Sequence, residues 1–313
     1  MFELLHILTP IFCLIGLGYL ALSRQLLSVE HVQALGQFVI KIALPSLLFL
    51  NLPQQPIQQL WQPSYFIAYS VASLLPFALL LWLYRTCFQR HLAESALYAM
   101  GGSMANTGFI GTAVLTLILG AQAAPFIAIT FLIENLLIFL LFILCLEVSK
   151  QSSQHWPTLL KRSVINIIKN PIIVALCLGC FLSLMQWPLP DVVSATIQPL
   201  AHTTAGLGLF VIGAGLYGMR THFDRSIWKD AAVIALVKLV LMPTLVYILL
   251  STMPNTSPEM IFSGVLLASV SMVTLFGVFG QSLGLQARSA PILMLTTLGS
   301  SISMSVVIYV LHP

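Results

Sequence analysis

Charged residues are scarce in this sequence, and their scarcity excludes most classes of soluble protein. Among 313 residues, 13 are Lys or Arg and 9 are Asp or Glu, so 7% are charged while 58% are hydrophobic. An average soluble domain is about 25% charged, and so few charges cannot cover a water-exposed surface. A soluble enzyme, a nucleic-acid-binding protein and a disordered chain are therefore excluded. The net charge of +4 does not by itself indicate a polyanionic partner, because the positions of the charges decide that.

Motifs for nucleotides, metals and cofactors are also missing. The sequence contains no G-x-x-x-x-G-K-[ST] and no H-E-x-x-H, and residues 101–105 only approach the G-x-S-x-G pattern of hydrolases. Cys177 and Cys180 form a C-x-x-C, but inside an apolar run where packing is the expected role. These absences argue against an intramembrane enzyme and an ATP-driven pump, and no cofactor or metal is expected.

Long apolar runs are what the sequence has instead. They approach the ~20 residues that cross a bilayer as a helix, and they are too long for the strands of a membrane barrel. Within lipid the backbone must satisfy its own hydrogen bonds, which makes such runs helical. We therefore predict an all-α integral membrane protein with ten transmembrane helices. The ten predicted spans are 4–22, 32–52, 64–84, 95–119, 124–147, 170–187, 192–217, 228–250, 259–280 and 288–311.

The basic residues alternate between successive loops. Eleven of the thirteen lie in or beside the loops after spans 1, 3, 5, 7 and 9, whereas the loops after spans 2, 4, 6 and 8 contain none. The positive-inside rule then places the odd-numbered loops in the cytoplasm and both termini outside. The N-terminus has no basic stretch before its apolar run, so we expect span 1 to be retained rather than cleaved.

A single hydrophilic stretch, 149–169, divides the chain into 1–148 with spans 1–5 and 170–313 with spans 6–10. Because each half has an odd number of spans, the halves point in opposite directions. This is the layout of inverted-repeat transporters, whose substrate site lies near the bilayer midplane. We expect 149–169 to be a cytoplasmic linker; a segment lying on anionic lipid of the inner leaflet is the alternative.

The residues of span 4 are unfavourable for an uninterrupted helix. Four glycines weaken it, and Asn106 places an amide near the centre of the bilayer. Small residues also permit close helix packing, so two interpretations stand. In the second, the helix unwinds near Asn106 and its ends attract an anion. Span 9 has a weaker form of this pattern, with small polar residues and glycines but without Pro or Asn. The sequence therefore leaves open whether the helix of span 9 is interrupted. Its small polar and glycine residues are Ser269, Ser271, Thr274, Gly277 and Gly280.

Four short motifs resemble those of one family of membrane transporters. They are Ala-Leu-Pro-Ser-Leu-Leu-Phe at 43–49, Asn-Thr-Gly-Phe-Ile-Gly at 106–111, Lys-Asn-Pro at 169–171, and Lys238-Leu239 followed by Met242-Pro243. In order and spacing they are similar to the auxin efflux carrier family, whose bacterial members include malate and malonate permeases. The resemblance implies a scaffold of spans 1, 2, 6 and 7 and a transport domain of the rest, with spans 4 and 9 broken and crossing at the substrate site. It also implies secondary transport of organic anions, often by homodimers formed through the scaffold, and we expect a bacterial inner-membrane protein.

The sequence departs from the family at the expected crossing. Ala105, Ala113 and Ser271 stand where prolines are usual, Leu275 stands where a polar residue is usual, and Gly206 replaces a common proline in span 7. These departures keep a second hypothesis open, a non-transporting membrane sensor with a carrier-like fold. Net flux of ligand separates the two hypotheses.

Four titratable residues lie well inside predicted spans: Lys41, Glu134, His202 and Lys238. A charge at the bilayer centre costs about 2.5–3.5 kcal/mol on insertion scales, so such groups are usually paired, neutralised or functional. Each lysine either attracts an anion or forms a structural pair. Glu134 either neutralises a lysine or takes up a coupling proton, and His202 either titrates with the proton gradient or is a hydrogen-bonded interior histidine. Two lysines, one glutamate and a neutral histidine leave about +1, which favours an anionic substrate.

The combined prediction is a secondary transporter that moves a small carboxylate, such as malate, malonate or an auxin-like acid, by alternating access. The expected coupling ion is a proton, with sodium as the alternative, and the expected arrangement is symport. Membrane lipid is a further expected partner. The predicted substrate-binding residues are Asn106, Thr107, Gly108, Ser271, Thr274, Lys41 and Lys238, and the predicted coupling residues are Glu134 and His202.

Overall fold

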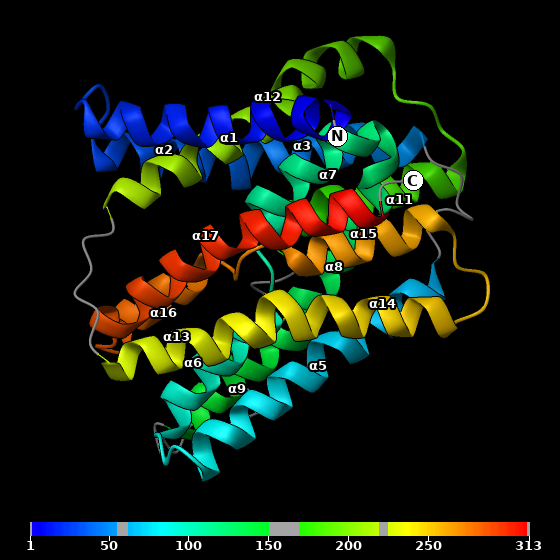
Figure 1. The fold of residues 1–313 in the computed structure, drawn as a ribbon. Helices are drawn as coiled ribbons and strands as arrows, with labels where there is room; N and C mark the ends of the chain where they lie inside the picture. The colour runs from blue at the N-terminus through cyan, green and yellow to red at the C-terminus, as the bar shows by residue number, and fades with distance from the viewer. Residues whose placement is uncertain (1, 55–61, 150–168, 219–224, 312–313) are drawn as a thin grey trace. The chain divides into compact units, whose positions relative to one another are not determined.

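Every regular element in the described chain is a helix. The computed structural model describes residues 2–54, 62–149, 169–218 and 225–311 (Figure 1). The predicted linker 149–169 lies almost wholly outside these ranges. The all-helical class is as predicted, and two compact units divide the chain.

The first unit comprises residues 1–62, 107–129 and 168–220. Its helix α12 packs against α1, α2 and α3. Glycines allow α1 and α12 to approach closely, because a Cβ atom on Gly18 would overlap the Phe210 carbonyl and one on Gly213 would overlap the Ile15 carbonyl. The unit's elements are α1 (Phe2–Ser23), α2 (Val29–Phe38), the π-helix η1 (Val39–Ala43), α3 (Leu44–Asn51), the 3₁₀-helix η2 (Leu52–Gln54), the π-helix η3 (Thr107–Gly111), α7 (Thr112–Leu119), the 3₁₀-helix η4 (Gly120–Ala123), the first part of α8 (Ala124–Ile133), α11 (Pro171–Met185) and α12 (Asp191–Gly218).

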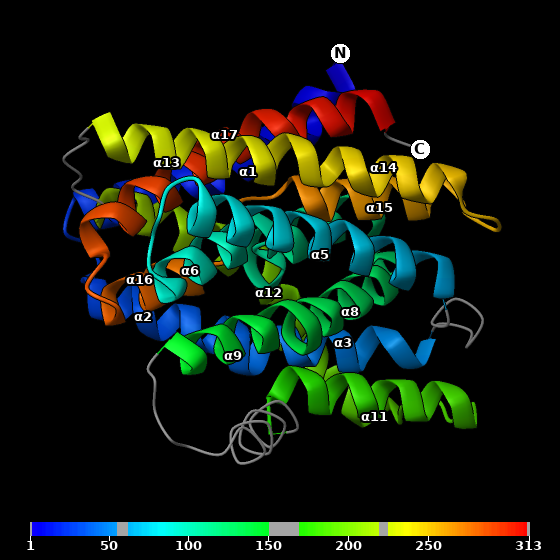
Figure 2. The same ribbon diagram turned by 90° about the horizontal axis from the view of Figure 1, so that it is seen from below.

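The second unit comprises residues 63–106, 130–167 and 221–313. Its helix α14 packs against α5 and α15, α5 against α6, and α17 against α13, α15 and α16; α14 and α15 are seen side by side in Figure 2. Large aromatic side chains, among them Tyr65, Tyr69, Tyr84 and Tyr98, fill its core. The elements are α5 (Pro63–Thr86), α6 (Leu92–Ser103), the rest of α8, the π-helix η5 (Glu134–Phe139), α9 (Leu140–Ser149), α13 (Arg225–Leu236), the π-helix η6 (Val237–Leu241), α14 (Met242–Thr252), α15 (Pro258–Ser269), α16 (Leu275–Ser282) and α17 (Gln286–Leu311).

The units do not coincide with the two halves of the sequence. The first unit contains predicted spans 1, 2, 6 and 7, which are the helices that the family resemblance assigns to a scaffold, together with 107–129, which it assigns to the other domain. Each unit draws on both 1–148 and 170–313, so the boundaries of the sequence repeats stay a prediction.

Helices occupy all ten predicted runs, but within the described ranges only six continuous helical stretches have the length and apolar composition of a membrane span. Shorter apolar helices cover 13–23, 171–185 and 258–269. One stretch, 107–149, has 43 residues, about twice what one crossing needs. Gly120, with a φ of +59°, ends α7 inside this stretch, near the predicted boundary between spans 4 and 5. The number of crossings stays a prediction.

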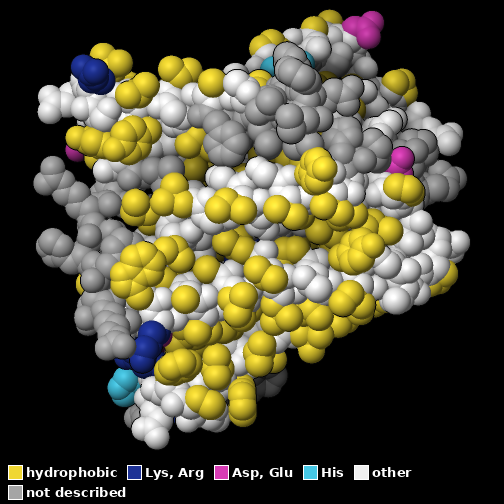
Figure 3. Space-filling model, in the orientation of Figure 1, with side chains coloured by type: hydrophobic (Ala, Val, Ile, Leu, Met, Phe, Trp, Pro, Cys, Tyr) yellow, Lys and Arg dark blue, Asp and Glu magenta, His cyan; other side chains and the backbone are white. Residues whose placement is uncertain are grey.

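The second unit presents an apolar face suited to lipid. Figure 3 shows hydrophobic side chains spread over α14 and α17 with few charges among them, and Val240, Ile302 and Val310 are each more than half exposed. A groove of about 810 Å³ lies on this face, lined from α13, η6, α14, α15 and α17. Exposed aliphatic side chains on spanning helices are what a bilayer solvates.

Candidate functional site

Two interrupted helices of the second unit meet at their breaks. Helix α6 ends at Ser103 and α15 ends at Ser269, and Met104 and Val270 then take extended backbone conformations. The Asn106 N–H donates to the Ser271 carbonyl at 2.8 Å, and the Val273 N–H donates to the Met104 carbonyl at 3.1 Å. Ala105 and Met272 thus form an antiparallel bridge. We call residues 104–106 and 270–273 the crossing. Both spans 4 and 9 are interrupted, although span 9 lacks proline there.

Serine ends both helices in the same way. The Ser103 hydroxyl donates to the Ala99 carbonyl and the Ser269 hydroxyl to the Leu266 carbonyl, each at 2.7 Å. These bonds engage backbone carbonyls near the end of each helix. Gly101 lets the broken region pack closely, because a Cβ atom there would lie 2.7 Å from the Phe276 ring.

Glu134 is hydrogen-bonded to residues 104–106, one segment of the crossing. Its carboxylate accepts the Ala105 N–H at 2.8 Å, and only 1% of the residue is exposed. Ala105 follows the end of α6, so its amide is not part of that helix's hydrogen-bond ladder. A carboxylate that accepts a backbone N–H makes a charge-assisted bond, roughly twice as strong as a neutral one.

Lys238 is hydrogen-bonded to α15, the other interrupted helix. It is fully buried, and its ammonium donates to the Ala268 carbonyl at 2.6 Å and to the Met242 sulfur at 3.3 Å. Ala268 is in the last turn of α15, where the helix macrodipole favours a cation. Lys238 also lies near enough to Glu134 for the two groups to interact electrostatically.

The four π-helical segments in the described ranges all carry predicted site residues. Lys41 is in η1, Thr107 and Gly108 are in η3, Glu134 is in η5 and Lys238 is in η6. In η1 and η6 the wide turn immediately precedes a helix with proline at its start. Proline lacks an N–H and its ring crowds the preceding turn, which explains widened turns there. Isolated π-turns inside α-helices are frequent at functional sites.

The second unit brings together four of the predicted residues and leaves a fifth at the edge. Asn106, Ser271, Glu134 and Lys238 are all buried at or beside the crossing. Thr274 is exposed and follows the crossing directly.

The remaining predicted residues belong to the first unit. The Thr107 hydroxyl is buried and has no hydrogen-bond partner within the described residues, and Gly108 next to it is partly buried. Lys41 is exposed and its ammonium reaches the Gln37 amide oxygen at 3.4 Å. His202 is also exposed.

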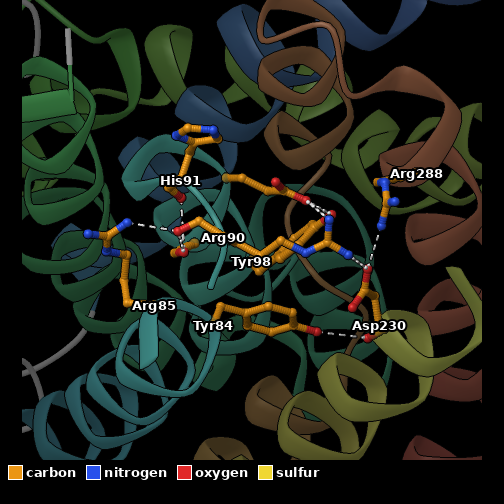
Figure 4. A network of polar contacts seen from close by, with 9 residues as sticks. Tyr84, Arg85, Arg90, His91, Tyr98, Asp230 and Arg288 are labelled. Atoms are coloured by element: carbon orange, nitrogen blue, oxygen red, sulfur yellow. Dashed lines mark hydrogen bonds and ion pairs between the residues drawn. The ribbon is translucent and has the colours of Figure 1, made fainter. Parts of the chain in front are cut away.

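A second polar cluster of the second unit is absent from the sequence prediction. Asp230, whose side chain is 3% exposed, lies between Arg288 at 3.0 Å and Arg90 at 3.6 Å, and Arg90 also pairs with Glu94 at 3.6 Å. Figure 4 shows Tyr84 beside Asp230, where its hydroxyl donates to the Asp230 backbone carbonyl. We call Arg90, Glu94, Asp230 and Arg288 the charge network.

The charge network has a sequence signal that the prediction did not use. Asp230 is an acidic residue inside predicted span 8, near the end of the span where basic residues gather. An acid placed among the arginines that flank neighbouring spans is expected to pair with them. Which arginines it meets depends on how α13, α17 and the α5–α6 turn pack.

Comparison with known proteins decides the family. A family model described as "Membrane transport protein" matches residues 4–308. The chain belongs to this family, the auxin efflux carrier family. The family resemblance of the sequence motifs is thereby confirmed, and the protein is a membrane transport protein and not an enzyme.

Individual relatives agree with this assignment. A protein of Rhizobium meliloti named "Putative malonate transporter" is 27% identical over 313 residues, which cover 100% of this chain and 97% of that protein. The "Uncharacterized transporter YfdV" of Escherichia coli is 25% identical over 240 residues, 75% of this chain and 74% of that protein. The mouse "Lysosomal cholesterol signaling protein" is 21% identical over 239 residues, which are 73% of this chain but only 27% of the mouse protein.

Proposed function

We propose that this family member is a secondary transporter of a small dicarboxylate, with malonate as the first candidate. It would work in a bacterial inner membrane through ten spans arranged as two inverted repeats, by alternating access. The observation that supports this most is the crossing, where two broken helices meet and two opposite charges are buried beside the break. Non-helical backbone at membrane depth is tolerated only where it is buried in protein or lines a cavity, and transporters build substrate sites from such segments.

The proposed substrate ligands are the residues that the sequence predicts. Asn106 and Ser271 lie at the crossing and Thr274 follows it. Thr107 contributes a buried hydroxyl that lacks a partner among the described residues. Buried polar groups are normally hydrogen-bonded, so a hydroxyl without a protein partner suits a ligand. Gly108 allows close approach of a ligand to the backbone, and Lys41 and Lys238 supply positive potential.

For the driving force we propose symport with protons through Glu134, with His202 as a second coupling residue. Glu134 supports this because its carboxylate bonds directly to the Ala105 backbone. A protonated, neutral carboxyl is a weaker acceptor than a carboxylate. Protonation would therefore loosen the crossing, which links proton binding to a change of conformation.

Uptake into proteoliposomes tests this function. Labelled malonate is supplied outside, with an acidic exterior and without sodium, and Asn106→Ala is compared with Asn135→Ala. Asn135 is a matched control because its amide donates to the Phe131 carbonyl of its own helix. We expect the wild type and Asn135→Ala to accumulate malonate, and Asn106→Ala to lose uptake while keeping its fold. Uptake by Asn106→Ala equal to the wild type would contradict the proposed site.

A sensor that does not transport is the second candidate. It is favoured by the similarity to the mouse protein named for signalling, over 73% of this chain, and by the non-proline residues at the crossing. Such a protein would bind malonate or another carboxylate without net flux. Equilibrium binding of labelled malonate together with zero uptake would select this alternative.

A further inference from the structure

Two tyrosines of α5 face two polar residues of α8 and η5 at successive helical turns. The Tyr65 hydroxyl and the Thr130 hydroxyl are hydrogen-bonded at 2.8 Å, and both residues are fully buried. One turn farther along both helices, Tyr69 lies near Glu134, where α5 packs against η5. The two tyrosine rings are stacked, with centroids 5.7 Å apart and planes 15° from parallel. These four side chains form a buried row of polar groups, which we call the polar file.

The Tyr69 hydroxyl is the unusual member of this file. It is fully buried and has no hydrogen-bond partner within the described part of the chain. It nevertheless lies close enough to the Glu134 carboxylate for the two groups to interact. A phenylalanine would fill the same space without leaving a buried hydroxyl unsatisfied, so packing alone does not account for tyrosine at this position.

The file runs from one end of α5 to the crossing. Tyr65 is in the first turn of α5, beside Ser64, whose hydroxyl donates to the Pro254 carbonyl in the turn between α14 and α15. The positive-inside rule places this end of α5 outside. At its other end the file reaches Glu134, which holds the Ala105 amide of the crossing.

Titratable groups of two other elements act on Glu134 within the described residues. From α5 they are Tyr65 and Tyr69, and from η6 the group is Lys238. The crossing contributes the Ala105 amide. Among these, the tyrosine hydroxyls can both donate and accept a proton without a lasting change of charge, so they are the groups suited to carry protons to the carboxylate.

We propose that Tyr69 relays protons between the outer end of α5 and Glu134. The Tyr69 O–H bond breaks as an O–H bond forms on the Glu134 carboxylate. Hydronium at the exposed end of α5, beside Ser64, gives up a proton and becomes water, and transfer through the Tyr65 and Thr130 hydroxyls restores the Tyr69 phenol. The net change is one proton on Glu134 and none on tyrosine. Tyr69 is thus a proton-transfer residue of the transport cycle, and this inference rests on the proposed proton coupling through Glu134.

Infrared difference spectroscopy on the full-length protein in lipid tests the relay without any substrate. After a drop in pH, the carboxyl C=O band that Glu134→Gln abolishes reports protonation of Glu134. We expect Tyr69→Phe to slow the appearance of this band at least about tenfold, since a positioned proton-transfer group typically contributes more than that. Thr130→Val, which removes one hydrogen bond of the Tyr65 hydroxyl, should slow the band to a smaller extent.

Tyr84→Phe is the matched control. Tyr84 is also a buried tyrosine of α5, but its hydroxyl bonds to the Asp230 carbonyl, away from Glu134. A band that appears at the wild-type rate in Tyr69→Phe overturns the relay, and so does the absence of a Glu134 band in the wild type. A band slowed equally in Tyr84→Phe also overturns it, because the effect would then be one of packing.

Malonate transport distinguishes this inference from the proposed function. In Tyr69→Phe we expect uptake driven by a pH gradient to fall, while exchange of labelled for unlabelled malonate, which needs no net proton movement, stays near the wild-type rate. Wild-type protein that moves no malonate in either assay contradicts the proposed substrate. The infrared result still decides the relay in that case.

Discussion

The crossing and the charge network are two buried polar clusters of one unit, but their charges bond to different things. At the crossing, Glu134 accepts a backbone N–H and Lys238 donates to a backbone carbonyl. In the charge network, charged side chains bond to one another, with Asp230 between two arginines. The crossing charges are almost completely buried, whereas the network arginines are 27% exposed.

This difference in bonding partners indicates what each cluster is suited to do. Charges bonded to backbone hold a segment that has no helical hydrogen bonds of its own, so a change in either charge changes the shape of that segment. Charges bonded to one another hold the ends of complete helices together, and their loss leaves the helices intact. We therefore expect function to depend on the crossing and mainly stability to depend on the network.

The largest effect is expected for Lys238→Met. It leaves Glu134 buried without its opposite charge, which typically destabilises a protein by about 3–5 kcal/mol. Thermal unfolding in detergent should show a clearly lowered midpoint. Adding Glu134→Gln should recover part of the loss, because the pair is then removed together. Equal stability of Lys238→Met and wild type would show that the two charges do not support each other.

A smaller loss is expected for Asp230→Asn. The change removes the carboxylate shared by Arg90 and Arg288, and because both arginines are partly exposed to screening we expect about 1–2 kcal/mol. Malonate uptake per folded molecule should stay near the wild-type level, with Glu94→Gln as a milder companion. Uptake that is lost as completely as in Lys238→Met would break the distinction between the two clusters.

A still smaller effect on stability, but a large one on uptake, is expected for Thr107→Val. The Thr107 hydroxyl has no partner within the described residues, so its removal should change the unfolding free energy by less than about 0.5 kcal/mol. Thr112→Val is the control, because the Thr112 hydroxyl donates to the Thr107 carbonyl at 2.7 Å. We expect the control to lose more stability and less uptake; the reverse order would remove Thr107 from the substrate site.

No effect on stability is expected from labelling the two ends of the second unit. Gln89 lies in the turn between α5 and α6, and Asn255 in the turn between α14 and α15. In a cysteine-free background, Asn255→Cys should react with an impermeant maleimide applied to intact cells, and Gln89→Cys should not. This would place the charge network at the cytoplasmic end. Reaction at position 89 alone would invert the orientation.

Much of the fold follows from the sequence because apolar length and helix formation are local properties in a bilayer. The predicted run 64–84 is α5 at Pro63–Thr86, and 288–311 is α17 at Gln286–Leu311. The break in span 4 was also predictable, since glycines and Asn106 are unfavourable within a helix. The break in span 9 was less so, because Ser271 and Thr274 are tolerated in helices and the pairing with 104–106 depends on a segment far away in the sequence.

The candidate site was predicted in part. The residue types were identifiable because an ionisable side chain inside an apolar run needs a reason to be there, which selects Glu134 and Lys238. Their bonds were not identifiable. The partners, Ala105 and Ala268, contribute only backbone atoms. Nearly every residue has a backbone donor and acceptor, so the sequence does not show which residue forms the bond.

The sequence by itself determined that this is an all-helical membrane protein of the auxin efflux carrier family, because hydropathy, the spacing of basic residues and short motifs are all read along one chain. Only the tertiary structure decided that Glu134 and Lys238 hold the crossing, that Asp230 gathers two arginines, and that Tyr69 faces Glu134. Each of these contacts joins residues from different helices, and helix packing sets which side chains meet.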